Sequence, residues 1–108
     1  MNELRDEPVR TRMVRVYLSE SDHGINRLVQ ILHDELNVRG VTVMRGIAGY
    51  GSSGQVHSAS LIDLSDDLPV ILEFFEDADK VSRAVARISE LVDPGHIVSW
   101  PVRIEEGG

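Results

Sequence analysis

The residues best suited to chemistry lie together in the middle of the chain, within positions 41–57. Four glycines fall within nine residues there: Gly46, Gly49, Gly51 and Gly54. The side chains beside them that can donate hydrogen bonds are Arg45, Ser52, Ser53 and His57. Glycines spaced this closely let the backbone adopt φ > 0 and let a ligand approach the main chain. Exposed main-chain N–H groups bind anions, so the segment predicts an anion contact, with phosphate as the first candidate.

The charges around this glycine-rich segment also favour an anion. Residues 39–62 contain no Asp or Glu, although the whole chain has 18 of them and a formal net charge of −7. Arg39 and Arg45 are the only formal charges in that stretch. A flexible hairpin loop would have the same glycine content, so a phosphate contact and a simple loop both stay open. The segment has no Gly-Lys-Ser/Thr and no helical pattern after it, which does not fit a Walker loop or a dinucleotide fingerprint.

Other candidate groups are few. His96 follows Pro94 and Gly95 in a turn, where it is either an exposed turn residue or a ligand contact. The four histidines form no i, i+4 pair, and the chain has no cysteine, so a metal site within one subunit is not expected. The cluster of Asp63, Asp66 and Asp67 fits a solvated turn better than an acid–base pair. No Ser-His-Asp set can be assembled, and the protein is not expected to be an enzyme.

Composition limits the class of protein. At 108 residues the chain is one domain, with residues 13–104 as the folded unit, 1–12 as a flexible arm and 105–108 as a tail. No apolar run approaches the roughly 20 residues of a membrane span, and no signal peptide is seen, so a cytoplasmic protein is expected. The acidic balance argues against a nucleic-acid-binding module, because phosphate backbones require a basic face.

Hydrophobic periodicity predicts the elements that must position the glycine-rich segment. Alternation predicts strands over 13–18, 41–47, 58–64, 70–75 and 97–104. The ranges 58–64 and 70–75 count as one strand that is interrupted before and at Pro69. Spacings of three and four predict helices over 25–36, with Asp22 as a candidate cap, and over 81–92. The order β-α-β-β-α-β predicts an α+β, ferredoxin-like sandwich with two helices on one face of an antiparallel sheet.

Two strands of this sandwich have features of their own. Residues 70–75 carry large apolar groups on both faces, which predicts that the second face meets a neighbouring subunit. Pro101 cannot donate to a strand ladder, which predicts an edge strand for 97–104. Trp100 on that strand is expected in the core, with a stacking platform for a base as the alternative.

With these elements in place, the chain resembles the PII-like proteins known as domain of unknown function 190. The matching stretches are TVMRGIAGYG at 42–51, QVHSASLIDLSDDLPVILE at 55–73 and the pattern of the second helix. The resemblance covers about residues 13–102. The GYG of 49–51 followed by GQVH at 54–57 is also similar to the segment that opens the T-loop of PII signalling proteins.

The resemblance implies a homotrimer of ferredoxin-like subunits that binds an adenine nucleotide between neighbouring subunits. The contacts carried over onto this chain are Arg45, Gly46, Gly49, Gly51, Ser52, His57, Gly95 and His96. The turn at Gly95 and His96 is short and has no lysine, so AMP or ADP is favoured over ATP unless Arg12 or Arg103 of a neighbour contributes. A signalling role implies a partner such as a membrane transporter or channel, with no metal required.

Two other functional classes are weighed against this one. CutA proteins share the fold, and a CutA-like metal-responsive trimer would bind divalent metal through groups such as His57 and Asp63. A small enzyme on the same scaffold would need a positioned acid–base pair, which the sequence does not offer.

Overall fold

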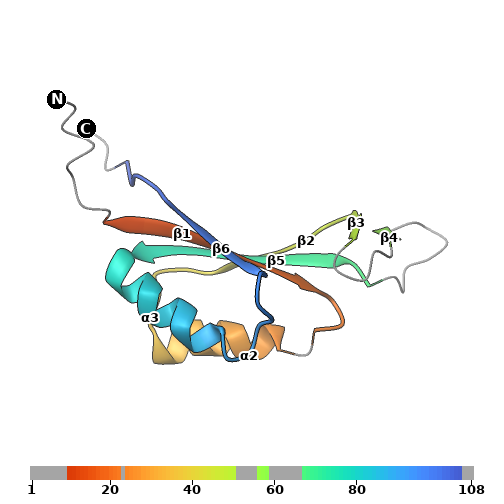
Figure 1. The fold of residues 1–108 in the computed structure, drawn as a ribbon, viewed down its shortest axis with the longest axis horizontal. Helices are drawn as coiled ribbons and strands as arrows, with labels where there is room; N and C mark the ends of the chain where they lie inside the picture. The colour runs from red at the N-terminus through yellow and green to blue at the C-terminus, as the bar shows by residue number, and fades with distance from the viewer. Residues whose placement is uncertain (1–9, 23, 51–55, 59–66, 106–108) are drawn as a thin grey trace.

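The computed structural model describes residues 10–22, 24–50, 56–58 and 67–105. Four strands form one antiparallel sheet in the spatial order β2-β5-β1-β6. They are β1 (Thr11–Ser19), β2 (Thr42–Arg45), β5 (Pro69–Asp77) and β6 (Ile97–Pro101). The helices lie together on one face of this sheet and leave the other face open (Figure 1). The expected ferredoxin-like sandwich is therefore confirmed.

The alternation in β1 sorts its side chains between the two faces. Val14 and Val16 are fully buried under the helices, whereas Arg15 points to the open face and pairs with Glu73 of β5. The core between sheet and helices is built from apolar residues of all these layers: Val14, Val16, Leu28, Ile31, Leu32, Val38, Leu72, Phe74, Val81, Ala84, Ile88 and Val92. Because one face of β1 and β5 is buried, a slip of one residue in register would expose this core.

The first helical segment is less regular than the sequence predicts. It consists of α2 (Ile25–Gln30) followed by a π-helical turn, η1 (Ile31–Glu35), in which the Leu36 amide donates to the Ile31 carbonyl at 3.1 Å. Leu28, Ile31 and Leu32 still face the core. The expectation that Asp22 caps this helix is wrong, because its carboxylate instead accepts the Ser19 amide at 2.7 Å within the preceding turn.

The second helix, α3 (Ala78–Ile88), ends earlier than its apolar stripe suggests. Val92 lies beyond the helix and is still buried, while Leu91 is 49% exposed. The strand before α3 is longer than the predicted 70–75, since β5 continues through Glu76 and Asp77. The Glu76 side chain is buried there and accepts the amides of Arg39 at 2.8 Å and Asp77 at 3.0 Å.

The position of β6 confirms one of the two expectations for this strand and contradicts the other. It is an edge strand, as Pro101 predicts. Trp100, however, is not part of the core: it pairs in register with Met13 and lies half-buried on the face opposite the helices. The guanidinium of Arg15 lies 5.3 Å from its ring centroid. The alternation of β6 places Ile97 on the helix side, so Trp100, three residues on, falls on the open face.

The glycine-rich segment contains a small hairpin of its own. β3 (Ala48–Tyr50) pairs antiparallel with β4 (Val56–Ser58) and lies at one end of the main sheet (Figure 1). The return strand expected over 58–64 falls almost entirely outside the described residues. No helix in the described part of the chain has the length and apolar character needed to cross a bilayer.

Candidate functional site

The predicted site residues that the structure describes gather at one end of the main sheet. β1 ends there at Ser19 and β2 ends there at Arg45, while β5 begins there at Pro69 and β6 at Ile97. The antiparallel order of the strands causes this, because the chain reverses direction at each neighbour. The β3–β4 hairpin follows directly from the same end (Figure 1).

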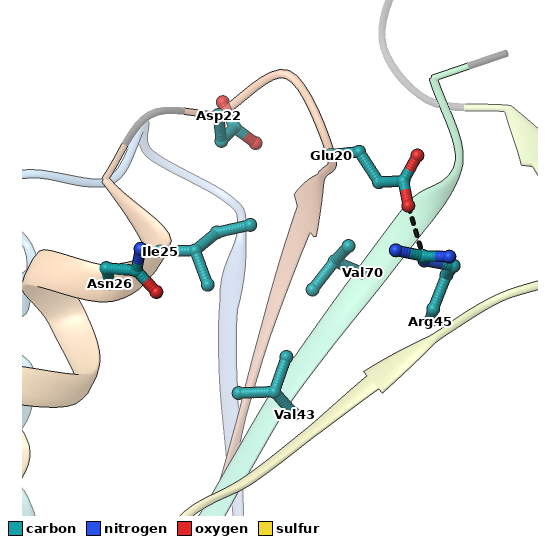
Figure 2. A pocket seen from close by; sticks show the side chains of 7 residues that line it. All are labelled: Glu20, Asp22, Ile25, Asn26, Val43, Arg45 and Val70. Atoms are coloured by element: carbon teal, nitrogen blue, oxygen red, sulfur yellow. Dashed lines mark ion pairs between the residues drawn. The ribbon is translucent and has the colours of Figure 1, made fainter. Parts of the chain in front are cut away.

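An open cleft of about 830 Å³ lies at this end of the sheet. Its wall residues come from the β1–α2 turn, the start of α2, and the ends of β2 and β5: Glu20, Asp22, Ile25, Asn26, Val43, Arg45 and Val70. Figure 2 shows the apolar side chains of Ile25, Val43 and Val70 between the turn and the strands, with Glu20 and Arg45 meeting at one side. The accessible lining of this cleft is mostly polar, and the three apolar side chains make up the smaller part of it.

Arg45 is the cation of this cleft, and it is already paired. Its Nε forms an ion pair with Oε1 of Glu20 (Figure 2). The Arg45 side chain is 70% exposed and that of Glu20 is 29% exposed, so the guanidinium is the more accessible partner. The stretch around Arg45 has no carboxylate in the sequence, but folding brings Glu20 and Asp22 to it from the β1–α2 turn.

Main-chain and side-chain hydrogen bonds hold the β1–α2 turn in place. The Glu20 amide donates to the Leu68 carbonyl at 2.9 Å. Ser21 donates from its amide and its hydroxyl to the two carboxylate oxygens of Asp67, each at 2.7 Å. The turn that carries Glu20 and Asp22 is therefore attached to the residues just before β5. The sequence predicts a solvated turn at Asp67, whereas its bonds to Ser21 give this residue a structural role.

Gly46 follows Arg45 and lies against Pro69. Its amide donates to the Pro69 carbonyl at 2.7 Å. That N–H is therefore committed to the protein and is not an open donor for an anion. The position needs glycine because a Cβ there would lie 2.7 Å from Cγ of Pro69.

The hairpin brings together two further predicted residues. Gly49 of β3 and His57 of β4 are direct partners in register. Cα atoms of such partners lie about 4.5–5.5 Å apart, so a residue with no side chain faces the backbone of His57. Gly51 and Ser52 lie outside the described residues, and their predicted roles remain predictions.

Gly95 and His96 lie at the same end of the sheet but at its opposite edge. Gly95 adopts φ = +86°, which favours glycine. The Nδ1 of His96 lies 3.0 Å from the carbonyl oxygen of Tyr17, and the Tyr17 amide donates to the His96 carbonyl at 2.9 Å. Since a carbonyl only accepts, Nδ1 carries the hydrogen, and Nε2 of the neutral ring is left as an acceptor.

Arg45 and His96 do not meet within one subunit. They lie on the two edge strands of the sheet, or directly beside them, with β5 and β1 in between. Neighbouring strands lie about 4.8 Å apart, so three spacings separate the two edges by roughly 14 Å. His96 lines a separate cavity of about 160 Å³, and Asp22 lines both hollows. One subunit therefore presents two partial sites that share a rim.

The residues missed by sequence analysis are those of the β1–α2 turn. Nothing in the local sequence links Glu20 to Arg45, because 24 positions separate them and only the β2-β5-β1 order brings them together. A metal site receives no support from the described residues, among which no three His, Asp or Glu side chains are grouped to hold an ion. Asp63 lies outside this part of the chain.

Comparison with known proteins adds a family and a fold. The model of the DUF190 family, described as "Uncharacterized ACR, COG1993", matches residues 11–104. A UPF0166 protein of Aquifex aeolicus is 36% identical over 72 residues, which span 64% of this chain and 70% of that protein. A UPF0166 protein of Methanocaldococcus jannaschii is 30% identical over 89 residues, which span 78% of this chain and 81% of that protein.

Solved structures with the same fold are more distant in sequence. CPII from Thiomonas intermedia K12, solved bound to ADP and bicarbonate, superposes with a TM-score of 0.65 at 14% identity, covering 90% of this chain and 93% of CPII. The divalent cation tolerance protein CutA1 from Thermus thermophilus superposes with a TM-score of 0.61 at 16% identity, covering 89% of this chain and 87% of that protein. At these identities the likeness shows the fold.

Proposed function

The chain belongs to the DUF190 family, and on this premise we propose that it is a PII-like, trimeric regulatory protein that binds AMP or ADP between neighbouring subunits. One observation carries the proposal. The cleft of Arg45 and the turn of Gly95 and His96 lie at the same end of the sheet but on opposite edges. When two copies meet edge to edge, the half-site of one faces the half-site of the other.

The open face of the sheet offers a further surface for association, apart from the two edges. Four large apolar side chains on it are 36–43% exposed: Tyr17, Met44, Phe75 and Val98. Arg15 and Glu73 form a pair between them, with hydrogen bonds of 2.5 and 2.8 Å, and Arg15 also stacks on Trp100. A patch of this kind on a small domain favours association with further copies.

The cleft suits a nucleotide of low charge. Its volume falls within the 300–1,000 Å³ typical of small-molecule sites, and its apolar residues can pack against a base or ribose. Arg45 is the cation available for a phosphate, whereas Glu20 and Asp22 add two negative charges. The local charge is therefore negative before a ligand binds, which favours AMP or ADP over ATP.

His96 has a different task in this arrangement. With Nδ1 donating to the Tyr17 carbonyl, Nε2 of an uncharged ring is an acceptor, which suits an amino group or a ribose hydroxyl better than a phosphate oxygen. We therefore assign the neighbour's His96 to the base or sugar, and Arg45 to the phosphate. CPII, solved with ADP and bicarbonate on the same fold, supports a nucleotide ligand for this scaffold.

The signalling role follows from where the ligand would bind. The β3–β4 hairpin begins three residues after Arg45, so a phosphate bound there adjoins the base of the glycine-rich segment. We propose that this segment reports the ligand to a protein partner in the cytoplasm, such as a transporter or channel, and that the protein catalyses no reaction.

Isothermal titration with AMP, ADP, ATP and cyclic AMP tests the proposal. We expect one site per subunit for AMP or ADP, with loss of binding in Arg45→Gln and unchanged binding in Arg83→Gln on α3. Absence of binding for all four nucleotides would contradict it. Titration with copper and zinc tests the CutA-like alternative, which the fold alone supports.

A further inference from the structure

We propose that Glu20 competes with the ligand phosphate for Arg45, and that this competition sets how much negative charge the site accepts. The inference rests on the proposed nucleotide-binding function and assigns a specificity-determining residue to it. Glu20 lies outside the glycine-rich segment and comes from the turn between β1 and α2.

The contact geometry places Glu20 where a phosphate would bind. Its Oε1 already pairs with the Arg45 Nε inside the cleft (Figure 2). A carboxylate and a phosphate use the same donors of a guanidinium, so the ligand either displaces Glu20 or shares Arg45 with it. Arg45 is 70% exposed, so its remaining donors can be reached by a ligand.

The main chain that carries Glu20 is held in position independently of Arg45. The bond from the Glu20 amide to the Leu68 carbonyl and the two bonds from Ser21 to Asp67 attach this turn to the residues just before β5. Displacing Glu20 from Arg45 therefore need not move the turn. Its negative charge would stay at the rim of the cleft even when a ligand has taken Arg45.

A fixed negative charge beside the phosphate site discriminates by ligand charge. Asp22 adds a second carboxylate, which its bond to the Ser19 amide holds in the same turn. Each further phosphate of the ligand brings more negative charge toward these two groups, so repulsion grows from AMP to ADP to ATP. Removing the charge of Glu20 should increase the affinity for ATP more than the affinity for AMP.

The expected effect can be scaled. An exposed ion pair changes an equilibrium constant by roughly two- to fivefold. We expect the Glu20–Arg45 pair to weaken ligand binding by about that factor. We expect Glu20→Gln to bind AMP roughly two- to fivefold more tightly than the wild type. The affinity for ATP should increase by a larger factor than the affinity for AMP. The ratio of AMP affinity to ATP affinity should therefore be smaller in Glu20→Gln than in the wild type.

The experiment is a titration of AMP and ATP into four proteins. They are the wild type, Glu20→Gln, Glu20→Gln combined with Arg45→Gln, and the control Glu90→Gln, which makes the same charge change on an exposed residue paired with Arg87. The double variant should lose binding, as Arg45→Gln alone does, because Glu20→Gln improves binding only while Arg45 is present to hold the phosphate. Circular dichroism confirms that each variant is folded.

The outcomes separate this inference from the proposed function. Equal or weaker binding by Glu20→Gln, with a wild type that binds AMP, overturns the inference and leaves the proposed function intact. If Glu20→Gln binds AMP and the wild type does not, the result supports the competition and overturns nucleotide binding by the wild type. No binding by either protein overturns both.

Discussion

The Gly46 amide donates a 2.7 Å hydrogen bond to the Pro69 carbonyl, and a Cβ on Gly46 would lie 2.7 Å from Cγ of the same proline. The end of β2 is thereby fixed against the start of β5, directly beside Arg45. Since the proline ring cannot turn away as a flexible side chain would, Gly46→Ala must displace one strand end. This contact gives the glycine a structural reason that does not depend on a ligand.

We expect Gly46→Ala to lower the free energy of unfolding by about 1–3 kcal/mol through overpacking. The matched control is Gly40→Ala, where no atom lies within 4 Å of the added Cβ. Urea unfolding of the two variants at the same protomer concentration compares them, because association would shift apparent stability. Equal stabilities would mean that the Gly46–Pro69 contact relaxes freely.

Gly95 tests backbone strain without any steric contact. Its φ is +86°, and a Cβ there would have no atom within 4 Å. Gly95→Ala should cost about 1 kcal/mol or more of stability, because alanine rarely adopts this conformation. Gly95→Asn should cost less, since asparagine tolerates positive φ better than other residues. Thermal unfolding of both variants gives the order, and the reverse order would contradict the assignment.

The pKa of Glu76 predicts how stability depends on pH. Burial raises this pKa. Hydrogen bonds from the Asp77 amide and from the Arg39 side chain and amide outweigh this effect, so the pKa lies below its ordinary value of 4.5. A carboxyl whose pKa is lowered by folding stabilises the protein above the unfolded pKa and stops doing so as pH falls through the folded pKa. Stability should therefore decline as pH falls below about 4.5.

Glu76→Gln tests this assignment. The variant should lose about 1–3 kcal/mol at pH 7 and show a weaker decline in acid, because charged hydrogen bonds to a buried group are lost. Glu35→Gln is the control: Glu35 pairs with Arg87 but is 41% exposed, so its loss should be small. Urea unfolding between pH 3 and 7 measures both. Parallel curves for Glu76→Gln and the wild type would show that Glu76 is not responsible.

The open sheet face predicts the oligomeric state. Tyr17 lies on this face on the central strand β1, beside Ile71 in register, and is 43% exposed. Tyr17→Glu should convert the assembly to monomers, because association would bury a new unpaired charge. Leu91→Glu changes a residue of similar exposure, 49%, that lies beyond α3, and should leave the assembly unchanged. Light scattering after size-exclusion chromatography measures both masses. A wild type that is monomeric would contradict the interfacial site.

The strands and the layer arrangement could be predicted because they follow local rules. Val14 and Val16 alternate with Arg15, and Pro101 marks an edge strand. The core position predicted for Trp100 is wrong, because aromatic character alone does not select a face of the sheet, whereas the register with Met13 does. β5 runs past the predicted 70–75 because the Glu76 carboxylate is buried and accepts main-chain amides, which the local sequence does not indicate.

The candidate site was only half visible from the sequence. Arg45, Gly46, Gly49 and His57 are close in the chain, and their grouping at one end of the sheet follows from the strands around them. The pairing of Arg45 with Glu20 depends on strand order across three strands, which no local pattern encodes. The hydrogen bond from the Gly46 amide to the Pro69 carbonyl also depends on strand pairing, because Pro69 belongs to the neighbouring strand β5.

A crystal structure of the protein with AMP tests the central claim most directly. We predict a trimer in which the phosphate contacts Arg45 of one subunit, with the guanidinium drawn from Glu20, while the base or ribose contacts His96 of the neighbour. Nucleotide bound elsewhere, or held by one subunit alone with the Glu20–Arg45 pair unchanged, would contradict the account.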